Sequence, residues 1–202
     1  MTLKNRGVRA LTAGALLMLA GCSGFRSDEA PAQVYTIDPV FEASKVETPA
    51  TAPSLRLLRP LAAPGLDNER IALRRSSQRL DYYAASRWPT PLPEFVQSLA
   101  IEALRASGKY RAVQSDGAAF AADEVLQIEI RRFQAEYSGE GAPVVHVQLL
   151  ATLGNRTDRK ALASVSAESS VNASENRMQA VVAAFQKAAT SALTELVQQL
   201  PP

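Results

Sequence analysis

The sequence contains a single cysteine, Cys22, and a single histidine, His146, among 202 residues. One cysteine excludes a disulfide within the chain. Cys22 and His146 together also cannot form a zinc or iron–sulfur site, because such sites need several thiolates or imidazoles at set spacings. The glycine-rich patterns GxxxxGK[ST] and GxGxxG, whose backbone amides cradle nucleotide phosphates, are absent as well. These absences argue against an ATPase and a structural metal site, and we expect no cofactor.

Residues suited to catalysis are also scarce. His146 stands between two valines, on the face of a predicted strand opposite the apolar stripe, where we expect a solvent-facing polar side chain rather than a general base. Four acids lie at the ends of predicted elements, where turn and cap residues normally lie: Asp67, Glu69, Asp123 and Glu124. We therefore expect no catalytic residue and a protein that is not an enzyme. The remaining alternative is a tethered hydrolase that depends on His146.

The N-terminal residues have the pattern of an export signal. Residues 1–9 carry three basic side chains and no acid, and residues 10–20 are apolar apart from one threonine. At about 1.5 Å per residue, a helix of this length spans about half of a ~30 Å hydrocarbon core. A cleaved signal is therefore favoured over a transmembrane anchor.

The single cysteine ends this apolar run. The residues LAGC at 19–22 resemble the lipobox of bacterial lipoproteins, in which the signal is cut before the cysteine and the cysteine is acylated, with palmitate among the acyl chains. The resemblance implies removal of residues 1–21 and lipidation of Cys22, and two or more acyl chains anchor a protein stably. Ser23 follows, where the sorting scheme of these lipoproteins uses aspartate for inner-membrane retention. The expected location is the periplasmic face of the Gram-negative outer membrane.

The remaining chain is close to neutral. Removal of residues 1–21 takes away three basic residues and leaves 19 basic and 20 acidic ones, without the clustered basic face that nucleic-acid binding requires. Residues 22–53 are rich in Pro, Ala, Ser, Thr and Glu, and we expect a flexible tether. The apolar island at residues 34–37 is either part of this tether or an edge strand of the domain that we expect over residues 54–202.

Short runs of alternating apolar and polar side chains predict the strands. The predicted strands cover residues 55–61, 70–75, 80–86, 110–114, 124–137, 145–153 and 161–171. Turns at residues 76–78 and 154–160 make antiparallel hairpins of the strands that flank them. In the longest strand the alternation changes phase, which predicts a β-bulge near Arg131 and Arg132.

Two amphipathic helices complete the expected fold. Thr90 and Pro91 suit the N-cap and first position of a helix over residues 91–107. A longer helix is predicted over residues 175–200, with Ser174 as its cap. The expected fold class is α+β, with a largely antiparallel sheet of about five to seven strands and both helices packed on one face.

The segment from Leu55 to Leu104 carries a specific family pattern. The residues of that pattern are Leu66-Asp67 after a proline, Ile71 with Arg74, Tyr82-Tyr83 on the return strand, Trp88, and Pro91-Leu92 at the start of a helix. In these features the chain is similar to the ABC-type transport auxiliary lipoprotein components, which include the lipoprotein of the paraquat-inducible operon. The similarity extends more loosely from Tyr35 to the C-terminal helix. One departure is that WPTPL, at residues 88–92, lacks the acid that these proteins often carry before Pro-Leu.

The resemblance implies a non-catalytic auxiliary subunit of an ABC-driven intermembrane lipid transport system. The implied partners are an MCE-type protein that spans the periplasm, its ABC transporter complex, the membrane through the anchor on Cys22, lipid cargo, and further copies of the chain as a homo-oligomer. The alternative is a periplasmic lipid-binding carrier that holds an acyl chain between the helices and the sheet.

A local basic cluster is the candidate interaction site. Arg74, Arg75 and Arg79 flank the turn at residues 76–78. The cluster is either a solvated face or the contact with an acidic patch on a partner or with anionic head groups.

Aromatic residues divide between the core and the surface. Trp88, just before the first helix, is expected to close one end of the core. Tyr82 and Tyr83 are adjacent on one strand and should point to opposite faces of the sheet, so that at most one is buried and the other is open to a partner or a lipid surface.

Overall fold

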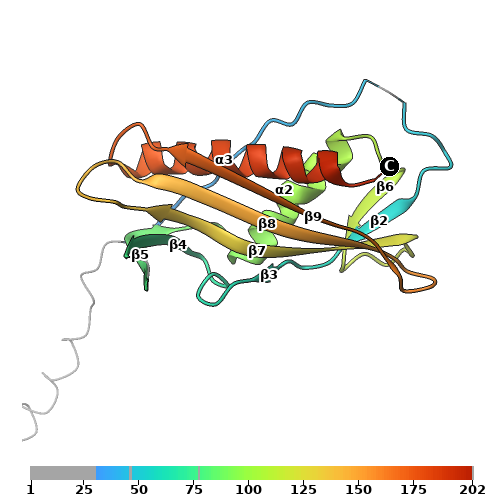
Figure 1. Ribbon diagram of the computed structural model, residues 1–202, viewed down its shortest axis with the longest axis horizontal. Helices are drawn as coiled ribbons and strands as arrows, with labels where there is room; N and C mark the ends of the chain where they lie inside the picture. Colours follow the sequence, from blue (N-terminus) through green and yellow to red (C-terminus); the bar gives the residue numbers. More distant parts are fainter. Residues whose placement is uncertain (1–30, 46, 77, 202) are drawn as a thin grey trace, which may run out of the picture. The chain divides into compact units, whose positions relative to one another are not determined.

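A computed structural model describes residues 31–45, 47–76 and 78–201. The predicted signal peptide, Cys22 and the first part of the predicted tether lie outside the described residues. Within the described residues, one sheet carries two helices (Figure 1).

The strands and helices are named in chain order. The strands are β1 (Gln33–Val34), β2 (Ser54–Leu57), β3 (Leu61–Ala62), β4 (Arg70–Ser76), β5 (Arg79–Arg87), β6 (Ala112–Ser115), β7 (Glu124–Glu136), β8 (Val144–Asn155) and β9 (Ala161–Asn172). The helices are α2 (Leu92–Ala106) and α3 (Met178–Gln199).

The fold class is α+β as predicted, but within the described part of the chain the sheet is mixed and has nine strands rather than five to seven. β7 is its centre. β2, β3 and β4 follow one another along β7 and pair with it in parallel, whereas β8 pairs with it antiparallel. The hairpins β4–β5 and β8–β9 are antiparallel as predicted. Alternation of apolar residues reports which face is buried but not strand direction, so the parallel pairs carried no signal in the sequence.

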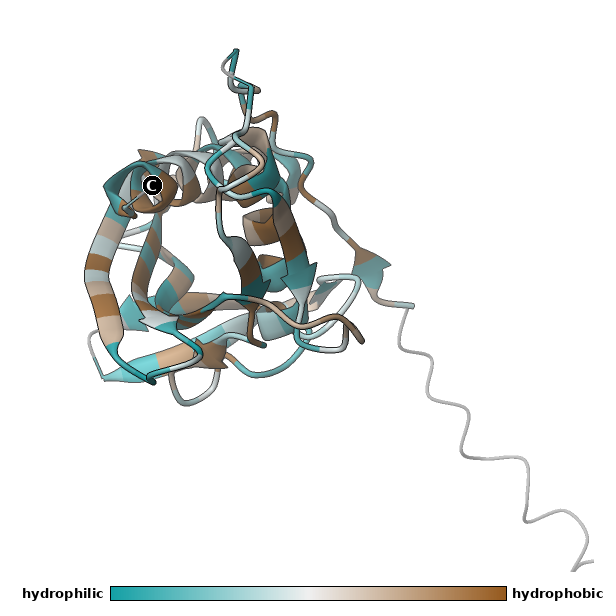
Figure 2. Cartoon of the chain, turned by 90° about the vertical axis from the view of Figure 1, so that its right-hand side faces the viewer, coloured by the Kyte–Doolittle hydropathy of each residue, from teal (hydrophilic) through white to brown (hydrophobic). Residues whose placement is uncertain are grey.

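Both helices lie on one face of the sheet, as predicted (Figure 1). Figure 2 shows the strands curving beneath the helices, with hydrophobic and hydrophilic residues alternating along each strand. The face of α3 toward β8 and β9 is rich in buried alanines, which let a helix approach a sheet closely. The buried face of the strands and the apolar stripes of the helices form one core.

The helices begin later than the sequence predicts. α2 begins at Leu92 with Pro91, not Thr90, at the N-cap position. α3 begins at Met178, three residues after the predicted start, so Ser174 is not its cap. Apolar periodicity locates the stripe that packs on the sheet, whereas the first turn depends on local backbone geometry.

The first predicted strand, residues 55–61, is divided into β2 and β3. The division falls at Pro60, which has no N–H to donate to the neighbouring strand. The segment between the paired residues of β2 and β3 is also one residue longer than the segment of β7 opposite it. The extra residue makes a bulge. A second bulge, between Ile130 and Arg132 where β7 pairs with β8, confirms the one predicted from the phase change.

The N-terminal apolar island is packed on the domain. β1 pairs in parallel with the end of β5, and the Tyr35 N–H donates to the Arg87 carbonyl at 2.8 Å. Ile37 is buried in the core. Of the two alternatives for residues 34–37, the edge strand is right for Val34, and residues 35–37 pack on the domain without strand pairing. This part of the predicted tether at residues 22–53 is held against the domain instead of being flexible.

Trp88 lies at the centre of an aromatic cluster between the helices and the sheet. Its side chain is 1 % exposed. Its ring centroid lies 5.2 Å from that of Phe95 on α2, 5.9 Å from Phe133 on β7 and 5.3 Å from Phe185 on α3. The expectation that Trp88 is a core residue is confirmed, and its ring joins both helices to the sheet.

Candidate functional site

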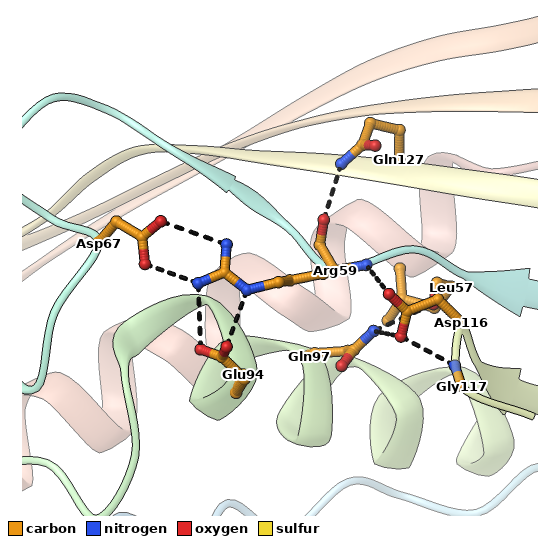
Figure 3. Close-up of polar contacts among 8 residues, drawn as sticks. All are labelled: Leu57, Arg59, Asp67, Glu94, Gln97, Asp116, Gly117 and Gln127. Atoms are coloured by element: carbon orange, nitrogen blue, oxygen red, sulfur yellow. Dashed lines mark hydrogen bonds and ion pairs between the residues drawn. The ribbon is translucent and has the colours of Figure 1, made fainter.

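A polar network surrounds Arg59, in the break between β2 and β3 (Figure 3). The Arg59 guanidinium donates to both oxygens of Asp67, at 2.6 and 3.2 Å, and its Nε donates to Glu94 Oε1 at 2.8 Å. Asp67 lies in the loop before β4, and Glu94 lies in the first turn of α2. One arginine thus joins the strand break, a loop and a helix N-terminus.

The backbone of Arg59 is held as firmly as its side chain. Its N–H donates to Asp116 Oδ2 at 3.3 Å, and its carbonyl accepts a 3.2 Å hydrogen bond from the Gln127 amide on β7. The Gln127 side chain therefore supplies a donor to the Arg59 carbonyl at the strand break. Gln97 of α2 completes the network by donating to the Leu57 carbonyl at 3.1 Å and to Asp116 at 3.2 Å.

This network stabilises the structure and is not arranged for catalysis. Hydrogen bonds from Arg59 lower the pKa of Asp67, and the hydrogen bond from Gln97 lowers the pKa of Asp116. Both carboxyl groups are therefore ionised at neutral pH and already occupied by donors of the chain. Such groups are poor general acids, and the network serves to connect α2 to the sheet.

The sequence reasoning did not identify Arg59. Asp67 was assigned to a turn, and the arginine was placed inside a continuous strand. The available signal was the dipeptide Arg59-Pro60 within an otherwise apolar run, because proline interrupts strand pairing and leaves polar backbone groups that need other partners.

The lowered aspartate pKa values predict acid sensitivity. A carboxyl group with a lowered pKa stabilises the fold above its ordinary value of 3.8, and that contribution is lost as the pH falls through the lower folded value. We expect the urea concentration at the unfolding midpoint to decrease as the pH is lowered below about 4. The decrease should be less steep in Arg59→Met, because this variant no longer lowers the pKa of Asp67. Arg105→Met is the control, because the Arg105 side chain donates to a backbone carbonyl. Equal pH slopes in wild type and Arg59→Met would contradict the assignment.

The predicted basic cluster lies at the tip of the β4–β5 hairpin, but its arginines are engaged separately. Arg74 lies 3.9 Å from Glu136 on β7, and Arg79 lies 2.9 Å from Asp81. The Arg75 guanidinium lies over the Tyr137 ring, 5.2 Å from its centroid. Because Arg74 and Arg75 are adjacent on a strand, they point to opposite faces of the sheet.

Tyr82 and Tyr83 also point to opposite faces, as predicted. Tyr82 donates to the Gly65 carbonyl at 2.8 Å, whereas the Tyr83 hydroxyl lies 2.9 Å from that of Tyr137. Both side chains are half-buried, and burial raises the pKa of Tyr83. Each hydroxyl is occupied within the chain.

His146 lies on the face of β8 opposite the core, between two buried valines, as predicted. Its side chain is half-buried rather than fully solvent-facing. Its Nδ1 lies 2.8 Å from the Ser170 hydroxyl, and its Nε2 lies 3.7 Å from Glu136. Glu136 also accepts from Arg132 at 2.5 Å and from Gln134 at 2.7 Å. The histidine therefore lies beside the ion pair of Glu136 and Arg132 on the outer face of the sheet.

A cavity of about 690 Å³ lies between the N-terminal segment and the C-terminal ends of the helices. Its lining includes Val40, Phe41, Val197 and Lys109. The Lys109 ammonium donates to the last carbonyls of α3, including that of Val197 at 2.9 Å. The carrier alternative places an acyl chain elsewhere, between helices and sheet, where the aromatic cluster around Trp88 lies.

Within residues 31–45, 47–76 and 78–201, neither helix is long and apolar enough to cross a membrane. The same residues contain no group of three or more His, Cys, Asp or Glu side chains placed to hold a metal ion.

The chain folds into an α+β domain. The polar side chains of its Arg59 network form hydrogen bonds within the chain. The model of the family described as "ABC-type transport auxiliary lipoprotein component" matches residues 35–197. Because this match covers most of the sequence, the chain belongs to that family, as the resemblance implied.

Solved structures agree on the fold. The crystal structure of protein XCC0632 from Xanthomonas campestris is 28% identical, with a TM-score of 0.71, and the match covers 82% of this chain and 92% of that chain. The crystal structure of an uncharacterised protein has a TM-score of 0.60 at 10% identity, over 79% of this chain and 99% of that chain. No curated protein matches the chain.

Proposed function

We propose that the protein is an outer-membrane lipoprotein that docks the periplasm-spanning, MCE-type component of an ABC-driven lipid transport system. Membership of the auxiliary lipoprotein family is the observation that carries this proposal. The internally bonded Arg59 network supports a non-catalytic role, because its carboxylates are held by the chain's own donors. Photocrosslinking in whole cells from positions on the β4–β5 hairpin, with identification of the captured protein, tests the partner. Capture of no transport component would contradict it.

Anchoring through Cys22 is the first part of the proposal. We expect the mature protein to begin at Cys22 and to carry three acyl chains, which is enough for stable attachment. Mass spectrometry of the mature N-terminus measures both features. An unmodified thiol, or retention of residues 1–21, would exclude this anchor. Sucrose-gradient separation of the two membranes then tests the outer-membrane location.

The β4–β5 hairpin is the proposed docking surface. Arg75 and Arg79 are the exposed cations near its turn, and the Arg79 side chain is 75% exposed. Reversing both to Glu should slow association with the partner in a salt-dependent way, because surface charge steers encounter. The change in unfolding free energy should stay within about 0.5 kcal/mol, as for most surface substitutions. Arg74 is left unchanged because its side chain is only 29% exposed and lies beside Glu136.

A single charge reversal on the other side of the domain is the matched control. Lys187 is exposed on α3, so Lys187→Glu should leave association unchanged when compared with Arg75→Glu. Pull-downs at low and high salt, together with thermal melts, separate binding from stability. Unchanged binding of the Arg75→Glu/Arg79→Glu protein at low salt would show that docking uses another surface.

A carrier function is the second candidate, with the acyl chain in the 690 Å³ cavity lined by residues 40–45 instead of the filled space between helices and sheet. Extraction of the purified protein and analysis of bound lipid distinguishes the two functions. Stoichiometric lipid that is lost in Phe41→Asp would support the carrier. A lipid-free protein that captures an MCE-type partner supports docking.

A further inference from the structure

A second group of cations lies in the β8–β9 loop. This loop is at the end of the β8–β9 hairpin that points away from the β4–β5 arginines. Arg156, Arg159 and Lys160 line a pocket of about 400 Å³. The sequence NRTDRK carries this cluster, but the sequence reasoning treated residues 154–160 only as a reversal of the chain. Figure 1 shows this loop at the same end of the molecule as the loop between β6 and β7.

These cations are less neutralised than those of the β4–β5 hairpin. Within the described chain, the side chains of Arg156 and Arg159 make no hydrogen bond or ion pair, and Lys160 lies 3.8 Å from Asp158. No acidic side chain lines the pocket. The pocket therefore presents excess positive charge that an anion can neutralise.

The floor of the pocket is formed by the outer face of the sheet. Val125 and Gln127 of β7 and Thr152 and Gly154 of β8 line it. Gly154 keeps the floor open, because it has no side chain on the face that it shares with Thr152. A Cβ at Gly154 would meet the Lys160 carbonyl at 3.5 Å, which is ordinary contact, so a larger residue fits there.

The loop is held in a defined conformation. The Asn155 N–H donates to the Lys160 carbonyl at 2.9 Å, and the Asn155 side chain accepts from the N–H of Thr157 at 2.8 Å. Arg159 has φ +57, in the left-handed region that favours glycine. An arginine in this conformation is consistent with a requirement for its side chain.

Two exposed apolar side chains lie at this end of the molecule. Phe120, in the β6–β7 loop, is 78% exposed, and Leu162, next to the pocket residue Ala161, is 48% exposed. The Arg156 N–H donates to the Asp123 carbonyl at 3.0 Å, which ties the loop that carries Phe120 to the basic loop. Exposed apolar residues beside cations are typical of surfaces that enter the interface of an anionic membrane.

We propose that this pocket binds the phosphate of an anionic phospholipid, with Phe120 and Leu162 entering the adjacent acyl region. Arginine favours phosphate because its planar guanidinium can donate two parallel hydrogen bonds. The site lies in the described domain and does not depend on lipidation of Cys22 or on the proposed docking partner. The test of this lipid-binding site is therefore independent of the test of the proposed function.

Calorimetric titration of the mature full-length protein in neutral detergent tests the proposal. The probes are dihexanoyl phosphatidylglycerol, dihexanoyl phosphatidylcholine, glycerol 3-phosphate and inorganic phosphate. We expect phosphatidylglycerol to bind at least about tenfold more tightly than the other three, since it combines net negative charge with acyl chains. Equal affinity for inorganic phosphate would overturn the lipid assignment and leave a phosphate-ion site. Equal affinity for phosphatidylcholine would indicate non-specific partition and also overturn it.

Three variants separate the pocket from general charge. Arg156→Ala and Arg159→Gly should each weaken phosphatidylglycerol binding about tenfold, and Arg159→Gly should not lower the melting temperature because glycine suits φ +57. Gly154→Leu keeps all three cations but fills the floor, and it should weaken binding to the same degree. Arg79→Ala, at the other end of the hairpins, is the control and should bind like wild type. Wild-type affinity in Gly154→Leu, or equal losses in Arg79→Ala, would refute a pocket.

Discussion

Replacement of Trp88 by alanine should destabilise the domain by about 3 to 5 kcal/mol, the range for removal of a large aromatic side chain from a core. The ring is 1% exposed and contacts aromatic residues of both helices and of the central strand. The space left by the ring would lie between both helices and the sheet. Urea titration followed by circular dichroism measures the loss, and cellular abundance should fall with it.

A matched truncation tests whether burial is the cause. Phe120 is also a large aromatic residue but is 78% exposed, so Phe120→Ala should change the unfolding free energy by less than about 0.5 kcal/mol. Binding to the transport partner, measured per folded molecule, should be unchanged in Trp88→Ala. A loss below about 1 kcal/mol in Trp88→Ala would contradict the core assignment.

Gly65→Ala should cost about 2 to 4 kcal/mol, although it adds one methyl group. Gly65 has φ +87, a conformation that is unfavourable for residues with a Cβ. A Cβ there would also lie 2.6 Å from Leu80 Cδ2 and 3.3 Å from the Tyr82 hydroxyl, so both the backbone and its neighbours would have to move. The substitution affects the loop that supplies Asp67 to Arg59.

Two other glycines supply the control for this prediction. A Cβ at Gly117 or Gly139 has no neighbour within 4 Å, and neither residue has positive φ. Gly117→Ala and Gly139→Ala should therefore leave the thermal midpoint unchanged or raise it slightly, because alanine reduces the entropy of the unfolded chain. If all three variants melted together, the strain attributed to Gly65 would be absent.

Much of the secondary structure could be read from local patterns. The hairpin β8–β9 and the two helices follow from apolar periodicity, and the bulge in β7 follows from its phase change. Trp88 could be placed in the core because it precedes an amphipathic helix. These features depend on residues that are near one another in the chain, so that local sequence carries the signal.

The site could be predicted less completely. Arg59 was missed because its partners, among them Asp67, Glu94 and Asp116, come from separate elements, and no spacing in the sequence relates them. The sequence shows that Arg74, Arg75 and Arg79 surround one turn. The contacts of Arg74 with Glu136 and of Arg75 with Tyr137 appear only when β4 is placed beside β7.

The sequence by itself determined the kind of elements, their order, the membership of Trp88 in the core and the family pattern between Leu55 and Leu104. The tertiary structure alone decided the parallel pairing of β2, β3 and β4 along β7, the Arg59 network and the pocket in the β8–β9 loop. The physical reason is the range of the interactions. Hydrophobic periodicity acts over a few residues, whereas strand partners and polar networks depend on which distant segments the buried core brings together.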